Sequence, residues 1–542
     1  MIKKISLTLT TACLTIICFA QDNSGEFHGD FDLNMQSYQE DELIGAKAAD
    51  EIILNNAYLN INYTKGDFSA GLRYESYLNA LLDFDDEYKG NGIMFRYATY
   101  TIDGLEVTAG NYYEQIGSGL IFRSYENKGL GQDNAMDGVR LKYRPLKGVY
   151  LKGFIGKSRT YFTYSDGIIR GADAEINVNE ALNLESKTRI IVGQGFVSRF
   201  QADINPKLKL PQNVAAYSSR LNIINGGWNY SGEYAIKLND PAGSATAEEN
   251  NYANGNALMS SLTYSQRGFG IVAEMHRVDH MEFRSERAQE KQYIINYIPT
   301  LTKQHTYTLL ALYPCATQPE GEFGTQVDVF YKIKKGSLLG GKYGTKISFN
   351  FSRINALNGG NSFLNDNSEH TPMFISIKGE ELYFRDLNLE IYKKINKKIK
   401  ATGILAKQSY NKDVLEGKTT YGTVESTIAI ADISYKIKKG HTIRIELQEL
   451  LADGGDGSWS MGLVEYTVSP HWFFAVQDMY NWGNHDLEKQ LHYVNIDCGF
   501  LSGSNRFAIG YGKKRAGIFC VGGVCKEVPS SNGFSLTISS SF

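Results

Sequence analysis

The chain lacks any apolar run long enough to cross a membrane as a helix once its first 20 residues are set aside, because a spanning helix needs roughly 20 consecutive apolar residues. Proline is scarce, at 10 of 542 residues, and the charged residues, 21 % of the chain, form no long block of one sign. The net charge of −3 gives no signature of polyanion binding. These absences argue against a helical membrane protein and against a nucleic-acid partner.

The N-terminus has the features of a Sec signal peptide. Lys3 and Lys4 precede an apolar stretch over residues 5–19, and Ala20 offers a small residue at a cleavage point. We therefore predict a signal peptide at 1–20 and a mature exported protein at 21–542. Acylation of Cys18 is the alternative, but two isoleucines precede it where lipoprotein processing needs a small residue.

Alternation of apolar and polar residues recurs along the mature chain and is clearest at its C-terminus. One face of the last segment carries Phe534, Leu536, Ile538, Ser540 and Phe542, and serines and a threonine occupy the other face. One face suits lipid and the other suits a wet lumen. The final Phe542 resembles the signal read by the outer-membrane assembly machinery. Since a membrane-spanning chain without spanning helices must form a closed barrel, we predict an all-β protein, one large antiparallel transmembrane β-barrel in the Gram-negative outer membrane.

Turn signals separate the alternating segments. Short ones fall at 65–66, 103–104, 145–148, 225–227, 267–268, 334–336, 396–398, 438–440, 469–471 and 502–503. Long connections fall at 38–51, 79–91, 112–137, 238–255, 281–324, 354–372 and 515–531. Short periplasmic turns and long extracellular loops are typical of outer-membrane barrels, and we expect about 24 strands within a range of roughly 18 to 26.

The stretch 110–144 mixes charges of both signs with glycines. Its candidate pore-lining or constriction residues are Glu114, Arg123, Glu126, Lys128, Asp133, Asp137 and Arg140. Such a loop could fold inward and narrow a pore, with its charges setting selectivity. Alternatively, the charges pair with one another on a lumen wall and hold it rigid, which is the interpretation we favour.

The segment 293–319 is long, aromatic and only partly alternating. It fits a plug or inward-folded loop as well as a surface loop that docks a partner protein, and the sequence does not choose between them.

Two cysteines flank a Val-Gly-Gly-Val sequence near the C-terminus. With the glycines as a two-residue hairpin turn, Cys520 and Cys525 become an opposed pair close enough for a disulfide. We predict this disulfide in an extracellular hairpin, with zinc binding as the weaker alternative.

No motif points to catalysis, a cofactor or a metal. His276 and His280 share one face but have no third ligand nearby, so we interpret them as polar lumen residues. We therefore expect no enzyme activity, although sequence alone leaves a hydrolase embedded in the barrel wall open.

The motifs at 110–115 and 117–120, together with the end from Cys520 to Phe542, resemble a family of Bacteroidota outer-membrane β-barrels, porin-like and of no established function. The resemblance runs along the mature chain. It implies the phylum, the barrel and the outer membrane, and it brings no substrate or catalytic residues.

Two functions fit a barrel of this size. The leading hypothesis is a pore or transport channel for solutes or larger cargo, because more than about 16 strands enclose a lumen too wide for side chains to fill. The alternative is a plugged structural or accessory barrel of a protein-secretion or outer-membrane assembly complex. Expected partners are outer-membrane lipid, the assembly machinery during insertion and possible envelope or secretion proteins.

A TonB-dependent receptor is disfavoured. Such receptors carry a folded plug domain before the first strand, whereas here the alternation starts by about Phe31.

Overall fold

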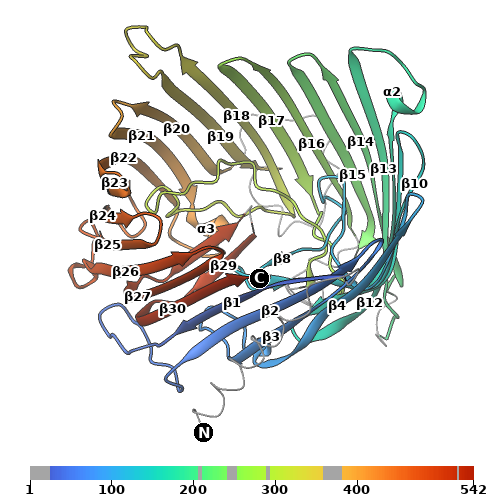
Figure 1. Cartoon of the computed structure of the whole chain (residues 1–542), viewed down its shortest axis with the longest axis horizontal. Helices are drawn as coiled ribbons and strands as arrows, with labels where there is room; N and C mark the ends of the chain where they lie inside the picture. The colour runs from blue at the N-terminus through green and yellow to red at the C-terminus, as the bar shows by residue number, and fades with distance from the viewer. Residues whose placement is uncertain (1–24, 205–209, 241–252, 288–292, 358–380, 522–523) are drawn as a thin grey trace.

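The described residues of the computed structural model are 25–204, 210–240, 253–287, 293–357, 381–521 and 524–542. They form one closed antiparallel sheet of 24 strands (Figure 1). The first strand of this sheet pairs with the second and also with the last, which closes the wall. The predicted barrel and its strand number are confirmed. The predicted signal peptide lies outside the described residues.

Each strand of the wall pairs with the next wall strand along the chain. The wall strands are β1 Glu26–Gln36, β2 Leu54–Lys65, β3 Phe68–Asn79, β4 Gly90–Ile102, β5 Leu105–Tyr112, β10 Met136–Leu146, β11 Val149–Thr160, β12 Thr163–Asn177, β13 Thr188–Phe200, β14 Asn213–Asn225, β15 Trp228–Asp240, β16 Ala253–Gln266, β17 Phe269–Asp279, β18 Gly321–Ile333, β19 Thr345–Ala356, β20 Leu382–Lys394, β21 Ile399–Asn411, β22 Thr423–Lys438, β23 His441–Asp453, β24 Trp459–Val468, β25 Trp472–Tyr480, β26 His492–Ser502, β27 Asn505–Lys514 and β30 Ser531–Ser541.

Smaller elements lie in the connections. The hairpins are β6 Gln115–Ile116 with β7 Phe122–Arg123, β8 Glu126–Asn127 with β9 Gln132–Asp133, and β28 Gly517–Val521 with β29 Val524–Val528. The helices are η2 Asp86–Tyr88, α2 Val178–Ala181, α3 Lys412–Glu416 and η5 Leu487–Lys489. None of the helices in the described part of the chain has the length and apolarity to span a bilayer.

The alternation read from the sequence separates the two faces of the wall. In β19, Phe349 is 36 % exposed on the outer face while its neighbour Asn350 is 1 % exposed on the inner face. In β30, Phe534 faces outward and Ser535 faces inward, opposite Gln36 of β1. Apolar side chains on the outside and polar ones on the inside suit a barrel embedded in lipid.

The two ends of the barrel differ in their connections. All ten predicted short turns lie at one end, where β1 begins and β30 ends. An eleventh connection at this end, residues 178–187, carries α2 and was not predicted. The pairing between β1 and β30, which we call the seam, continues there to Phe542, whose N–H donates to the carbonyl of Gly29 at 3.0 Å. By analogy with outer-membrane barrels, this end is assigned to the periplasm.

Two connections at the opposite end fold back into the barrel instead of projecting from it. We call residues 113–135 the first inward segment and the described residues 280–287 and 293–320 the second inward segment. Their apolar side chains form buried clusters with inward-facing residues of the wall, and Figure 1 shows chain crossing the interior between the strands. The segment 293–319, whose place the sequence left open, therefore lies in the lumen.

Candidate functional site

Two glycines, one near the end of β5 and one within the first inward segment, take backbone conformations that other residues rarely adopt. Gly110 has φ +97, and a Cβ there would lie 2.4 Å from the carbonyl oxygen of Arg96. Gly117 has φ +56, and a Cβ there would lie 2.5 Å from Oε1 of Glu233. Any other residue at these positions would be strained and crowded. Ser118 then donates its backbone N–H to Glu233 at 2.7 Å, which ties the segment to β15.

A buried ion network fixes the far part of the first inward segment. Asp133 accepts from Arg159 at 2.7 Å and also from Arg73. Arg159 makes a second, two-pronged pair with Glu75, at 2.7 and 2.6 Å. The side chains of Arg73, Arg159 and Glu75 are at most 4 % exposed. Charges so deeply buried are tolerated only when paired, so the network holds the segment in one position against β3 and β11.

Glu126 joins this network from the neighbouring hairpin. Its carboxylate lies 2.9 Å from Arg73. Burial is the largest influence on this carboxyl group and raises its pKa, although Arg73 acts in the opposite direction. Glu126 is therefore attached to the wall rather than facing an open pore.

Glu114 sits in a second charge cluster at the start of the segment. Lys152 donates to it at 3.0 Å, and Lys142 and Arg140 lie 3.5 and 3.8 Å away. Burial acts to raise the pKa of Glu114, but the nearby ammonium of Lys152 and the other cations outweigh it, so this pKa lies below its ordinary value. The carboxylate is thus held charged by the lumen wall.

Three further candidate residues have partners of their own. The Arg123 guanidinium lies over the rings of Tyr125 and Tyr297, 4.6 and 4.1 Å from their centres. Lys128 donates to Asp32 of β1 at 2.7 Å. Arg140, besides its contact with Glu114, donates to a carboxylate of β5 at 2.7 Å. These residues lie in the lumen as paired groups.

Asp137 is the exception among the seven candidates. Its neighbour Met136 is fully buried in the lumen cluster, so Asp137 occupies the outer face of β10. There it accepts from Arg96 at 3.2 Å, and Arg96 is half exposed. Asp137 therefore does not line the lumen.

The two inward segments form one body. Arg123 donates its backbone N–H to the carbonyl of Ile295 at 2.7 Å, and Tyr297 donates to Gly119 at 2.9 Å. Their side chains pack together against the inner wall from β12 to β17. The wall residues at this contact, all fully buried, are Ile169, Val197, Val214, Ala216, Ala235, Ala257 and Val278.

Two buried asparagines clamp this body. Asn296 donates to the carbonyls of Leu120 at 3.0 Å and Met281 at 2.7 Å, and it accepts from the N–H of Phe283 at 3.0 Å. Asn134 donates to the carbonyl of Ile294 at 2.9 Å, which joins the first segment to the second. Both side chains are almost fully buried, so each bond satisfies a backbone group that water does not reach.

The rest of the second inward segment covers the opposite wall. Leu309, Leu310, Leu312 and Tyr313 are buried against the inner faces of β19 to β25. His305 makes a hydrogen bond with Asp386 of β20. This half of the segment therefore has a core-like contact of its own, in addition to its link with the first inward segment.

Titratable groups gather where the second inward segment leaves and rejoins the wall. The carboxylate of Asp279 accepts a hydrogen bond from His280 Nδ1 at 2.6 Å, which raises the pKa of His280. Burial raises the pKa of Glu320 to about 7, with Lys237 acting against it. His276, the other predicted lumen histidine, is fully buried 2.8 Å from Glu322. Among the described residues no group of three or more potential ligands could hold a metal ion.

One arc of the inner wall has little apolar packing against the inward segments, although Lys128 of the first segment reaches Asp32 of β1 and lies over the ring of Tyr58 of β2. It runs through the adjacent strands β26, β27, β30, β1 and β2, and we call it the polar arc. Its inward-facing side chains are small or polar and keep part of their surface accessible, and they include Asp30, Asn34, Asn60, Asn62, Asn495, Asp497, Ala508, Ser535, Thr537 and Ser539. The lumen is therefore packed on two sides and hydrophilic on the third.

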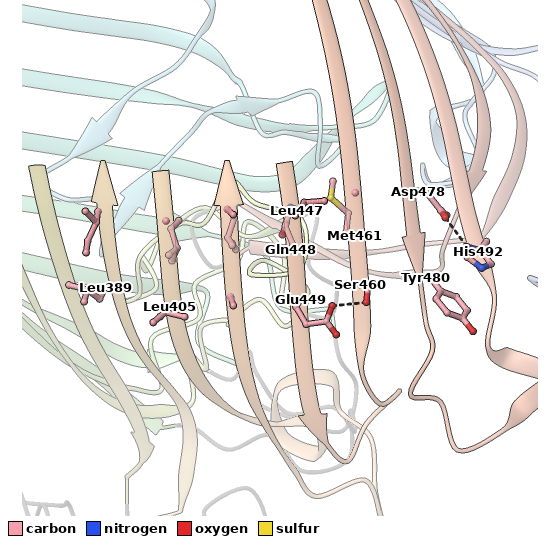
Figure 2. Close-up of a pocket in the computed structure, with 17 residues that line it drawn as sticks. Leu389, Leu405, Leu447, Gln448, Glu449, Ser460, Met461, Asp478, Tyr480 and His492 are labelled. Carbon is pink, nitrogen blue, oxygen red and sulfur yellow. Dashed lines mark hydrogen bonds and ion pairs between the residues drawn. The ribbon is translucent and has the colours of Figure 1, made fainter. Parts of the chain in front are cut away.

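A pocket of about 860 Å³ lies apart from the lumen, on the outer face of β20 to β26 (Figure 2). Leu389, Leu405 and Leu447 line it and face outward, and Glu449 with Ser460 and Asp478 with His492 form hydrogen-bonded pairs at its rim. The pocket therefore opens on the outer face of the wall and not into the lumen.

The cysteines near the C-terminus take the predicted register. Cys520 and Cys525 are directly opposed in the β28–β29 hairpin, while the turn 522–523 lies outside the described residues. The disulfide itself stays a prediction. Cys315 and Cys498 are free thiols.

Known structures with this shape are outer-membrane barrels. The P pilus usher (PapC) translocation pore is 11 % identical over 95 % of this chain and 99 % of that chain, with a TM-score of 0.46. PapC in an E. coli P pilus tip assembly intermediate with PapD, PapK and PapG is 10 % identical over 97 % of this chain and 62 % of that chain, with a TM-score of 0.51. The siderophore receptor PirA of Pseudomonas aeruginosa is 9 % identical over 96 % and 81 %, with a TM-score of 0.42.

At such identities the similarity is one of fold alone, and it identifies an outer-membrane β-barrel. The Bacteroidota origin stays a prediction. No curated protein sequence matches the chain. The family of unknown function DUF6029 matches residues 1–542, and the chain belongs to that family.

Proposed function

We propose that the protein is an outer-membrane channel that passes small polar solutes along the polar arc, beside a fixed filling made by the two inward segments. The observation that carries the proposal is the contrast between the walls. Inward-facing residues of β12–β17 and β19–β25 are buried under apolar contacts, whereas those of the polar arc keep accessible polar surface.

The filling favours small solutes over large cargo. Ten apolar side chains of the second inward segment are nearly or fully buried: Met281, Phe283, Ile295, Ile298, Leu301, Leu309, Leu310, Leu312, Tyr313 and Cys315. Each large one contributes about 1.5–3 kcal/mol on burial. Expelling the whole segment to admit a folded protein would expose all of them together, so the filling is a permanent part of the channel.

Single-channel recording in planar bilayers tests the proposal, with paired tryptophan variants that narrow or spare the arc. Asn34→Trp and Ala508→Trp place a bulky ring on the inner face of β1 and β27. Leu33→Trp and Ile509→Trp place the same ring on the lipid face of the same strands. We expect steady openings in the wild type, smaller ones in the inward variants, and wild-type conductance in the outward variants.

The second candidate function is a plugged accessory barrel of a secretion or assembly complex, which the apolar packing of the second inward segment favours. Silence of a correctly folded barrel would support this role and contradict the channel. Equal conductance in the inward and outward variants would show that the ions do not follow the polar arc.

A further inference from the structure

Lysines cluster at the periplasmic end of the barrel, although charged residues are spread evenly along the sequence. Three consecutive hairpins, β18–β19, β20–β21 and β22–β23, end there. Their lysines are Lys332, Lys334, Lys335, Lys342, Lys346, Lys393, Lys394, Lys397, Lys398, Lys400, Lys436, Lys438 and Lys439. We call this set the basic mouth.

No acid balances these charges locally. Aspartate and glutamate are absent from residues 329–350, 391–412 and 433–445. Within the part of the chain that the structure describes, none of the thirteen lysines takes part in an ion pair. Neighbouring turns are two strands apart, about 10 Å, which is close to the Debye length of about 8 Å at physiological salt. The three turns therefore act as one positive surface.

The placement of these lysines lowers the stability of the folded barrel, because some of them face each other directly. On the lumen face, Lys332 of β18 lies directly opposite Lys346 of β19. Lys394 of β20 lies directly opposite Lys400 of β21 in the same way. Like charges facing each other across a strand pair are destabilising. Lys346 and Lys394 lie over the rings of Tyr392 and Tyr343, which offsets part of this repulsion but leaves the positive charge of both pairs unneutralised. Two such pairs in adjacent hairpins favour an anionic partner.

Two exposed leucines lie among the lysines. In the turn between β18 and β19, Leu338 is 98 % exposed and Leu339 is 67 % exposed. Both project from the turn connecting the strands that carry Lys332 and Lys346. A purely ionic partner would leave these leucines in water, so a partner that fits this surface has an apolar contact as well as negative charge.

The location of the lysines distinguishes between two possible partners of the basic mouth, a periplasmic protein and the surrounding lipid. Lys332, Lys346 and Lys400 are on the inner face of the wall, where headgroups of the leaflet outside the barrel do not reach. A segment seated across the periplasmic opening reaches the inner-face lysines and the turn lysines together. We propose that the basic mouth docks an acidic segment of a periplasmic protein, which covers Leu338 and Leu339 with apolar side chains of its own.

Binding of a labelled peptide to the purified barrel in phosphatidylcholine nanodiscs tests this. The probe is a short chain of glutamate and aspartate with two central leucines, followed by fluorescence anisotropy over a salt series. The test variant is K335E/K398E/K439E, with one reversal in each basic turn. The matched control is K65E/K147E/K187E, which reverses three exposed lysines in other connections at the same end.

We expect salt-sensitive binding that weakens roughly tenfold or more in the test variant and is unchanged in the control. L338S/L339S should weaken binding of this peptide but not of a leucine-free polyglutamate. Equal binding by test and control variants overturns the proposal. If the leucine substitutions have no effect, or if phosphatidylglycerol nanodiscs abolish peptide binding by occupying the lysines, the partner is a simple polyanion or the leaflet instead.

Discussion

Replacing Asn296 by leucine should loosen the filling of the barrel without unfolding the wall. The change keeps the size of the side chain but removes its three hydrogen bonds to the backbone of Leu120, Met281 and Phe283. Each buried backbone group left unpaired costs about 1–3 kcal/mol. Even the low end of that range gives roughly 3 kcal/mol in total, which raises the population of displaced states about a hundredfold.

Planar-bilayer recording should detect these displaced states as brief, frequent increases of conductance above the wild-type level. The matched control is Asn34→Leu, at a lumen position on the polar arc whose side chain makes no hydrogen bond to the described residues of either inward segment. Thermal unfolding of both variants should resemble that of the wild type, because the wall hydrogen bonds are untouched. Wild-type gating in Asn296→Leu would refute the idea that this clamp holds the two inward segments together.

Three other outcomes follow from the contacts. Glu75→Gln breaks a buried two-pronged pair with Arg159 and should lower stability by about 3–5 kcal/mol, measured by denaturant unfolding. Thiol titration of the unfolded, unreduced mature protein should count two thiols rather than four if Cys520 and Cys525 are bonded. Burial raises the pKa of Glu320 from 4.5 to about 7, so its protonated form is favoured in the fold. The stability it contributes is present below pH 4.5 and lost as the pH rises through 7. The melting temperature should therefore fall across that interval in the wild type, and less so in Glu320→Gln.

The wall was predictable because lipid imposes its pattern residue by residue. Every strand must present an apolar outer face, as Phe349 does beside the inward Asn350, and the connections at the periplasmic end are short or hold a single helical turn. The missed connection at 178–187 contains a helical turn, α2, whose Asn177 caps it by accepting from the N–H of Glu180. Eight of the ten predicted short turns contain glycine, and residues 178–187 contain none.

The filling was harder to predict, because its apolar side chains would suit a plug and a docking loop equally well. A signal was nevertheless present in the wall. In β21 and β22, residues such as Ile404 and Ile428 are apolar on the inward face, next to outward apolar residues such as Leu405. A strand that is apolar on both faces has lipid on one side and protein on the other. The three lysine runs were missed for a different reason, since each is short and only the closed sheet brings them together.

The width of the barrel connects these features. A wall of 24 strands encloses more space than side chains fill, and the chain fills part of it with segments inserted after β5 and after β17. Both segments enter from the extracellular end and pack together against β12 to β17. Buried ion pairs also hold the first segment to β3 and β11, and the second segment covers β19 to β25. The polar arc, which contains the pairing of β1 with β30, carries little of this apolar packing. The seam strands thus serve two roles, because the same small and polar residues that close the barrel also form the hydrophilic side of its lumen.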